Sequence, residues 1–455
     1  MKTREQIIAK EQKELAKWKK MKAQPVRKGY MILMVVVISI VYLLDAMATD
    51  LHSGLSELEI TYFSQQLGLS YEVVLSLFSI VGTLTIVINL IAPFYKALAD
   101  KIGRKALFMI STVGMGIGLL LGYFSTNLVI YVIGRVILTF FVIADIQVIY
   151  IMEVAKPDKR AQLLGVTKFL SILGTLIIPL CRDLLLDPSG SNWRDVCIVP
   201  TLLAIICVFL IALFIRESDV FLDQKIAYLE RPYEEREAER ARMKASKEID
   251  TNKASLGTAI RYIFKDKQLG VLVISYGVLL LGMCSAGTYY NTIFMQRGMD
   301  TDTITATLYM YPISSALVTL LGGFLSDILG RKVTSAINGS LALISMIACG
   351  SLAGVAHPLV VGAFRGMVHG CFWCFGDTIN MMIGESARTE IRGSTTAAIG
   401  FVTLLASMVS SIVYGILLLF IELNLLCIIG GAITIGGALL LVCLGAKETK
   451  GKILV

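Results

Sequence analysis

Charged residues are scarce in this chain: Asp, Glu, Lys and Arg make up 17% of its 455 residues, whereas apolar residues make up 56%. Its mean hydropathy is +0.74. Such a composition supplies too little polar surface for a soluble globule of this size, so it excludes that class and places the chain in a lipid bilayer.

Signatures of catalysis and metal binding are missing as well. The sequence contains no His-Glu-x-x-His, no Gly-x-Ser-x-Gly and no phosphate-binding glycine loop, so we expect no enzyme and no cofactor. The nine cysteines lie almost wholly inside apolar segments, where a thiol packs as a small hydrophobe. Cys371 and Cys374 have no second pair of ligands nearby, and we assign them to core packing and not to a metal site.

Long apolar runs are what the sequence has in place of these features. Runs of about 20 residues are long enough to cross a membrane as helices. They predict twelve helices, at 29–50, 72–95, 106–126, 128–152, 161–185, 196–215, 268–293, 303–326, 333–354, 358–383, 393–421 and 425–445. We therefore expect an all-α membrane protein.

The basic residues lie on one side of these predicted helices. The two terminal segments and the connecting segments on the same side hold 36 of the 42 Lys and Arg residues, and the positive-inside rule makes that side the cytoplasm. The net charge of +8 is thereby explained without nucleic acid. The acidic residues expected in the outer loops are Glu57, Glu59, Asp187, Asp195, Asp300 and Asp302.

The predicted organisation has five parts. They are a basic cytoplasmic N-terminus (1–28), a six-helix bundle (29–215), a charged cytoplasmic linker (216–267), a second six-helix bundle (268–445) and a cytoplasmic tail (446–455).

One short motif occurs once in each half. Asp100-Lys-Ile-Gly103-Arg104-Lys105 is matched 227 positions later by Asp327-Ile-Leu-Gly330-Arg331-Lys332. A charged turn between two long apolar segments belongs at a membrane surface, so the pair indicates an internal repeat. It resembles the loop between the second and third helices of each half in the major facilitator superfamily.

Further motifs resemble the sugar-porter branch of that superfamily. Glu153 precedes Arg160 and Glu385 precedes Arg392 by the same seven positions, and the tail carries Lys447-Glu-Thr-Lys-Gly. The resemblance implies two pseudo-symmetric six-helix bundles that alternate in access. It also implies a cytoplasmic gate that ties the halves together, made of Asp100, Gly103, Arg104, Lys105, Glu153, Arg160, Asp327, Gly330, Arg331, Lys332, Glu385 and Arg392.

The chain also departs from these patterns. The seventh predicted helix carries Tyr289-Tyr290 but lacks the paired glutamines with which sugar porters bind sugar hydroxyls. The fifth lacks the Gly-x-x-x-Gly-Pro run of drug/proton exporters, which favours uptake or facilitated passage over efflux. A sugar, a polyol, an organic cation and an organic anion all remain open as substrates.

Ionisable residues inside apolar helices are few and costly, and so indicate function. Asp45 lies sixteen residues into the first predicted helix and Arg135 seven residues into the fourth. At about 1.5 Å per residue they reach similar depth and would face each other. The resemblance agrees, because proton-coupled sugar porters carry an acid and an arginine on these helices. We expect proton coupling through this pair; the alternative is a static ion pair.

A second pair of acids follows the repeat. Asp145 and Asp377 each precede the Glu of their half by eight residues, which places them at equal depth. Lys168 is level with Asp145 on the next helix, and Gly400 stands at the matching place in the second half. We therefore expect Asp145–Lys168 to be a structural ion pair and Asp377 to take part in coupling.

The tenth predicted helix presents one polar and aromatic face. Arg365, His369, Trp373 and Asp377 follow at four-residue steps, which keeps them along one side of a helix. Lipid offers no partner for Arg or Asp, so we expect this stripe to line the substrate cavity. Weaker substrate-binding candidates of the same kind are Tyr289, Tyr290 and Asn291.

The sequence thus predicts a multi-pass protein of the cytoplasmic membrane, with both termini inside, that moves a small organic solute by proton-coupled symport. The alternatives are an uncoupled facilitator and a non-transporting sensor of the same fold. Its expected partners are the small-molecule substrate, protons and the lipid bilayer, without nucleic acid, and we expect a monomer.

Overall fold

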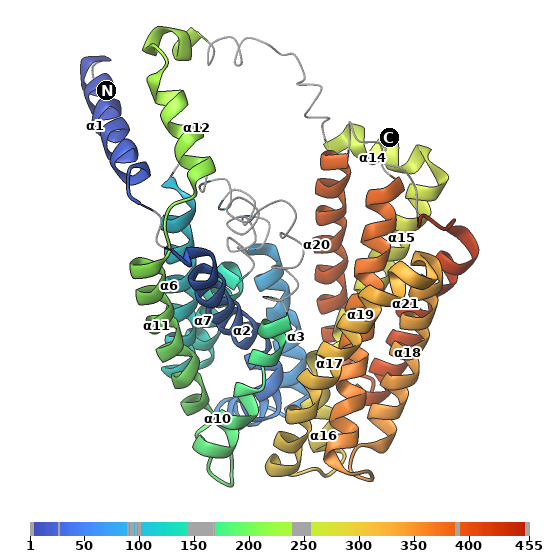
Figure 1. Ribbon diagram of the computed structural model, residues 1–455. Coiled ribbons are helices and arrows are strands. Elements are labelled where there is room, and N and C mark those ends of the chain that lie inside the picture. Colours follow the sequence, from blue (N-terminus) through green and yellow to red (C-terminus); the bar gives the residue numbers. More distant parts are fainter. Residues whose placement is uncertain are drawn as a thin grey trace.

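A computed structural model describes residues 4–25, 28–88, 91, 95, 98, 102–142, 167, 169–238, 256–386 and 392–450. The described chain is helical and contains no strand. Its long helices form two groups that stand side by side (Figure 1). This agrees with the expected all-helical membrane fold.

The N-terminal group contains α2 (Tyr30–Leu67), α3 (Tyr71–Ile88), α6 (Arg104–Tyr123), α7 (Leu128–Val142), α10 (Ile177–Leu185), the 3₁₀-helix η3 (Trp193–Cys197) and α11 (Ile198–Phe214). The C-terminal group contains α15 (Lys267–Leu281), the π-helical turn η4 (Cys284–Thr288), α16 (Tyr290–Gln296), α17 (Thr301–Leu329), α18 (Arg331–Leu352), α19 (Pro358–Ser386), α20 (Arg392–Leu417) and α21 (Leu423–Gly445).

Three further helices lie at one end of the two groups: α1 (Arg4–Lys22), α12 (Asp219–Glu230) and α14 (Leu256–Lys265). Both chain termini and the repeated turns at 102–105 and 330–332 are at this end, which we name the motif end (Figure 1). The other end, with the turns that follow α2, α6, α16 and α18, is the closed end, for the reason given in the next subsection.

Eight of the described helices are long and apolar enough to cross a membrane. Shorter apolar helices cover 71–85, 128–142 and 267–281. The described helices overlap all twelve predicted ranges, because runs of apolar side chains allow every backbone polar group to be satisfied within a helix in lipid. The number of spans, twelve, and the division into two six-helix bundles stay predictions.

The first long helix differs from its predicted range. Helix α2 runs for 38 residues, where the sequence predicted an end near residue 50. Glu57 and Glu59, which were expected in an outer loop, lie on this helix and are each only 1% exposed. That expectation was wrong because partners on other helices neutralise both carboxylates, so the polar stretch continues as buried helix.

Small residues let several helices approach closely. A side chain at Gly362 or Gly366 of α19 would overlap the backbone of α17, and a Cβ at Gly118 of α6 would lie 2.7 Å from the amide nitrogen of Leu138 on α7. Lipid gives little hydrophobic force between helices, so this close packing is a main source of their association.

These contacts predict different effects for two glycine substitutions. Gly366→Ala should destabilise the protein by about 1–3 kcal/mol, because the new Cβ meets the Tyr311 backbone, which cannot turn aside as a side chain can. Gly323→Ala is the matched control, since nothing lies within 4 Å of a Cβ at that position. Thermal unfolding of the purified variants measures both. Equal stability of the two variants would contradict the packing described above.

Candidate functional site

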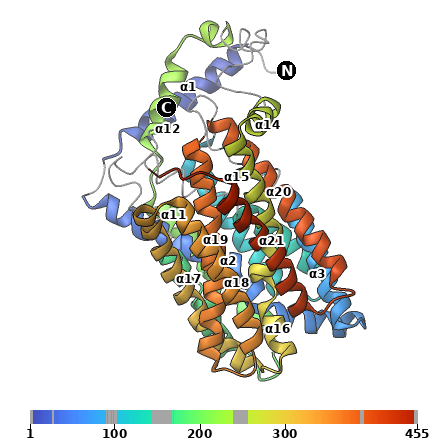
Figure 2. The same ribbon diagram turned by 90° about the vertical axis from the view of Figure 1, so that its right-hand side faces the viewer.

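The two helix groups are joined by hydrogen bonds at the closed end. In the described chain, bonds of this kind link α3 to α16 (Tyr71 Oη to Thr292 Oγ1, 3.2 Å) and α3 to α20 (Ser79 Oγ to the carbonyl of Ser411, 2.9 Å). Figure 2 shows α3 and α20 side by side, and they pack along each other. This end of the space between the groups is therefore shut.

A cluster of charged and aromatic side chains lies just inside this closure. Asp50 of α2 accepts a hydrogen bond from the Tyr311 hydroxyl of α17, at 3.3 Å. The Arg365 guanidinium of α19 lies 4.7 Å from the centre of the Tyr311 ring and is 2% exposed. The carboxylate of one group thus faces an arginine of the other, so their attraction favours the closed arrangement.

The hydrogen bonds of His369 determine which of its nitrogens carries a proton. The Trp373 indole can only donate, and it does so to His369 Nε2 at 3.1 Å. Nε2 is then an acceptor, so the neutral ring carries its proton on Nδ1 and donates it to Ser315 Oγ at 2.9 Å. Three of the four predicted stripe residues, Arg365, His369 and Trp373, therefore belong to one connected cluster.

The Gly54 carbonyl of α2 is a shared acceptor between the groups. It receives a hydrogen bond from Arg182 Nη1 of α10 and another from Asn291 Nδ2 of α16, the latter at 3.0 Å. Arg365 in turn donates to the Asn291 amide oxygen. A Cβ at Gly54 would lie 2.9 Å from the Ile178 side chain, so a larger residue here would displace that side chain of α10.

Glu57 and Arg182 form a buried ion pair at 2.7 Å, with their side chains 2% and 0% exposed. The contact is close but misaligned for a hydrogen bond, and both atoms lack a hydrogen-bonding partner in the described chain. Arg182 Nε donates to Thr305 Oγ1 of α17 at 2.8 Å. The pair therefore sits within the contact between the groups.

Glu59, the next acid on α2, points toward α7. It accepts hydrogen bonds from the Tyr131 hydroxyl at 2.5 Å and from His52 Nδ1 at 2.8 Å. Arg135 Nη1 donates to the same Tyr131 oxygen at 3.4 Å. Arg135 is thus neutralised mainly within the N-terminal group, through Tyr131 and Glu59.

The predicted meeting of Asp45 and Arg135 is wrong. Arg135 lies at the level of Glu59, and Asp45 is fourteen residues away on the same helix, or about 21 Å along its axis. The error follows from the predicted end of α2: a helix that continues to Leu67 places Asp45 much farther from the closed end. Asp45 is half-buried and has an interaction of its own.

The remaining substrate candidates lie in two places. Tyr289, Tyr290 and Asn291 follow the π-helical turn and are 6%, 2% and 0% exposed, so they belong to the closure. Asp377 is exposed, further toward the motif end on α19, and it too has an interaction.

Very little free space is left in this cluster. The cavity lined by Asp50, Ser53, Thr175, Tyr311 and Arg365, among others, measures about 10 Å³. That is room for about one water molecule. A bound solute therefore requires the closure to loosen or lies nearer the motif end.

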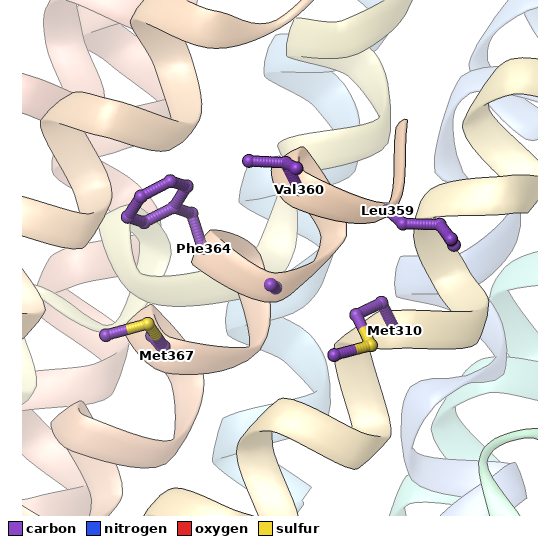
Figure 3. A pocket seen from close by; sticks show the side chains of 6 residues that line it. Met310, Leu359, Val360, Phe364 and Met367 are labelled. Carbon is purple, nitrogen blue, oxygen red and sulfur yellow. The ribbon is translucent and has the colours of Figure 1, made fainter. Parts of the chain in front are cut away.

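A larger hollow lies elsewhere and is entirely apolar. Met310, Leu359, Val360, Ala363, Phe364 and Met367 of α17 and α19 line about 410 Å³ (Figure 3). A polar solute would lose its hydrogen bonds to water here and gain none. We therefore do not assign the substrate site to this hollow.

The two repeated turns at the motif end share one arrangement. Gly103 and Gly330 have φ angles of 101° and 98°, which favour glycine. Glu217, just after α11, accepts a bond from the Arg104 amide at 2.8 Å. Glu448, just after α21, accepts one from the Arg331 amide at 2.9 Å. Each carboxylate thus caps the first turn of the helix that follows its repeated turn, α6 for Glu217 and α18 for Glu448.

The predicted gate residues are only partly described. Arg331 pairs with Glu385 at 3.3 Å within the C-terminal group, and the amides of Lys105 and Lys332 also donate to Glu217 and Glu448. Asp100, Asp145, Glu153, Arg160 and Lys168 lie outside the described residues, as do the side chains of Asp327 and Arg392. The tie across the two halves, and the Asp145–Lys168 pair, stay predictions.

Sequence reasoning missed most of the cluster at the closed end, namely Asp50, His52, Gly54, Glu57, Glu59, Tyr131, Arg182 and Tyr311. A signal was present: positions 50, 54 and 57 share one face of a helix, and 52 and 59 share another. It was not used because Thr49 to Glu59 is polar enough to resemble a loop.

The sequence of this chain is similar to one protein family and to several known proteins. The family model described as Major Facilitator Superfamily matches residues 30–411. The glucose transporter GlcP of Staphylococcus epidermidis is 24% identical over 339 residues, or 70% of this chain and 74% of that protein. The multidrug resistance protein MdtG of Salmonella arizonae is 31% identical over 160 residues, or 34% of this chain and 39% of that protein.

Solved structures agree on the fold. A D-xylose-proton symporter has a TM-score of 0.71 at 19% identity and covers 93% of this chain and 100% of its own. The partially occluded inward-open xylose transporter XylE of E. coli has a TM-score of 0.66 at 18% identity, over 94% of this chain and 100% of its own. At this identity the likeness concerns architecture alone.

The buried Glu57–Arg182 pair predicts a large asymmetry between single and double variants. Arg182→Gln leaves a buried carboxylate without its cation and should destabilise the protein by about 3–5 kcal/mol. Adding Glu57→Gln removes the unpaired charge and should restore much of that loss. Thermal unfolding of the two purified variants tests this; a double variant no more stable than Arg182→Gln alone would show that charge pairing is not what Arg182 supplies.

Proposed function

The chain belongs to the major facilitator superfamily, and from that premise we propose that it is a secondary active transporter that moves a sugar or polyol across a membrane by alternating access. Proteins of this family and fold are transporters and not enzymes. The observation that carries the proposal is the closure between the two helix groups. It consists of individual hydrogen bonds and one buried charge cluster, which can separate as a unit when the groups rock apart.

Charge balance in the closure favours a neutral solute. Each carboxylate of α2 in this region has a guanidinium nearby: Asp50 faces Arg365, Glu57 pairs with Arg182, and Glu59 shares Tyr131 with Arg135. Three negative and three positive charges leave no surplus for an ionic solute to neutralise. A sugar or polyol, which needs hydrogen bonds only, suits such a site better than an organic ion.

The named relatives support the same class of solute. GlcP is a glucose transporter by name, and the two structures given above are of a D-xylose-proton symporter and a xylose transporter. In the proposed site, Arg365, His369, Asn291, Tyr289 and Tyr290 supply polar groups to the solute. Trp373, which is 38% exposed, offers an aromatic ring, and Asp377 lies nearer the motif end.

The proposed orientation places the motif end in the cytoplasm, because the basic residues gather there. Twelve spans in two six-helix bundles, a location in the cell membrane with both termini inside, and a monomer complete the proposal. The described arrangement, shut at the closed end, then corresponds to an inward-facing form. The turns at the motif end would form the cytoplasmic gate when the protein faces outward.

Proton coupling is part of the proposal, with Asp45 and Asp377 as proton-binding residues. Each is a carboxylate on a helix long and apolar enough to cross the membrane, where a charge is costly unless it is paired or functional. Protonation removes that charge and so changes the relative free energy of the two forms. Arg135 contributes to coupling indirectly, through its hydrogen bond to Tyr131, which in turn donates to Glu59.

A second candidate function is export of an apolar compound. The MdtG match favours it, although that match covers 39% of MdtG. The buried charges of the closure argue against it, because an apolar compound would make no use of them.

Uptake into proteoliposomes tests the proposed function. Purified protein should accumulate radiolabelled hexose, pentose or polyol when the pH outside is lower than inside, and should equilibrate the solute without a gradient. Equilibration that a gradient does not change would indicate a facilitator. Binding without uptake would indicate a sensor, and efflux of dyes in place of sugar uptake would favour the second candidate.

Asp45→Asn tests the coupling step. The variant cannot take up or release a proton at this position, so gradient-driven accumulation should fall about tenfold or more while exchange of labelled for unlabelled solute continues. Asp302→Asn, an exposed acid in the first turn of α17, is the matched control and should leave both unchanged. Full accumulation by Asp45→Asn would exclude this residue from coupling.

A further inference from the structure

Helix α1 precedes the first membrane-spanning helix and packs against α12, the first helix after the N-terminal group. Figure 1 shows both at the motif end, and they contact each other along their length. In proteins most of the stability of a helix comes from tertiary packing and less from the propensity of its own residues. Packing against α12 therefore stabilises α1 where it lies.

A small apolar core holds the two helices together, separate from the main core of the protein. Trp18 of α1 is 7% exposed, and Phe221 and Leu222 of α12 are 2% and 1% exposed. Met21 and Ile226 pack against them. Polar helices that only lie near each other do not bury three large apolar side chains, so this burial indicates a specific interface.

Ion pairs fix the alignment of this interface. Lys19 pairs with Glu230 at 2.7 Å, and Lys22 pairs with Asp223. These pairs are half-exposed and contribute little stability each. The Arg236–Glu11 pair, at 2.8 Å, is more buried, with side chains 5% and 19% exposed. The order of these contacts makes α1 antiparallel to α12.

The end of α1 is also fastened to the start of the linker. Arg216, the second residue beyond α11, donates from Nη2 to the carbonyl of Gln24 at 2.8 Å. Its backbone amide donates to the Tyr30 hydroxyl at 2.9 Å. The residue next to Arg216 is Glu217, whose carboxylate caps α6.

Phe221 connects this interface to the repeated turn. Its ring meets Trp18 edge-on with centroids 5.4 Å apart, and the Arg104 guanidinium lies 4.9 Å from its centre. Its edge is 3.4 Å from where a Cβ on Gly103 would be. Phe221 thus contacts Trp18 on one side and the turn at 103–105 on the other, and Glu217 lies beside this turn.

The C-terminal group supplies an internal comparison. Glu448 caps α18 as Glu217 caps α6, at 2.9 Å to the Arg331 amide and 3.0 Å to the Lys332 amide. At the N-terminal cap, Phe221 of α12 packs beside the turn and Glu217 is 6% exposed, whereas Glu448 at the C-terminal cap is exposed.

The two caps therefore differ in their response to protons. Burial raises the pKa of Glu217 above its ordinary value. Burial acts in the same sense on Glu448, but the amides of Lys450, Lys332, Arg331 and Thr449 outweigh it, so the pKa of Glu448 is lowered. As the pH falls, Glu217 is protonated first and loses its strength as an acceptor while Glu448 keeps its charge.

We propose that α1 is an intramolecular brace. By packing Trp18 on Phe221, it holds the Glu217 cap on the turn at 103–105. Through this turn it sets the rate at which the N-terminal group changes conformation. The effect on transport rests on the proposed function, whereas the effect on the cap does not. Release of α1 would loosen one of the two repeated turns and leave the other in place.

Hydrogen exchange of the capped amides tests the brace without any substrate. In Trp18→Ala, amides in the peptide that spans 103–107 should exchange about two- to tenfold faster, the range expected for loss of one aromatic contact. The peptide that spans 330–334 is the reference and should not change. Lys13→Ala, on the exposed face of α1, is the matched control variant and should leave both peptides unchanged.

Two outcomes of this experiment overturn the brace. Unchanged exchange at 103–107 in Trp18→Ala would show that α1 does not support the cap, and equal acceleration at 330–334 would show general loosening. If Trp18→Ala does not fold, Lys19→Glu takes its place. Its exchange at 103–107 should rise, and it should return to the wild-type rate when Glu230→Lys restores the ion pair. A rise without rescue would also count against the brace.

Transport then tests the second part of the proposal. Trp18→Ala should change the initial rate of solute uptake at least about twofold relative to Lys13→Ala, with the two proteins equally folded. Faster exchange at 103–107 with an unchanged uptake rate would remove the link from the brace to conformational change. Absence of uptake by the wild type would count against the proposed function, while the exchange result would still decide whether the brace exists.

Discussion

The structure depends above all on one constraint: a charge buried among membrane-spanning helices needs a counter-charge, because no water is present to solvate it. Helix α2 carries Asp50, Glu57 and Glu59 within ten residues, and each is met by a side chain from a different helix. Without Arg182, Tyr131 and Tyr311 this polar stretch would have to leave the bundle. These ionic and hydrogen-bonding partners are what allow α2 to continue to Leu67.

The same constraint explains how the two helix groups meet. Some counter-charges lie in the group of α2 and others in the opposite group, so neutralisation at the closed end is complete only when the groups are together. Gly54 shows this most directly, because its carbonyl accepts from Arg182 on one side and Asn291 on the other. The closure is held by polar contacts of moderate strength, which suits an end that has to open and shut in the proposed mechanism.

At the motif end, the internal repeat gives two turns of nearly identical backbone geometry with different surroundings. Each has a glycine at positive φ and a carboxylate that caps the following helix. One carboxylate, Glu217, is buried beside α12, and the other, Glu448, is exposed. Repetition of sequence therefore does not produce repetition of electrostatics. At the first turn the surroundings include Phe221 of α12, which lies outside the repeat and packs beside Gly103 and Arg104.

The sequence by itself determined the membrane class, the positions of the long helices and the two matching turns, because these follow from local apolar runs and short motifs. It also identified Arg365, His369 and Trp373 as one face of α19. The pairing of charges was decided only by tertiary structure. Arg135 meets Tyr131 and Glu59 and not Asp45, since the depth of a residue depends on where its helix ends. The end of α2 in turn depends on partners such as Arg182, more than a hundred positions away in the chain.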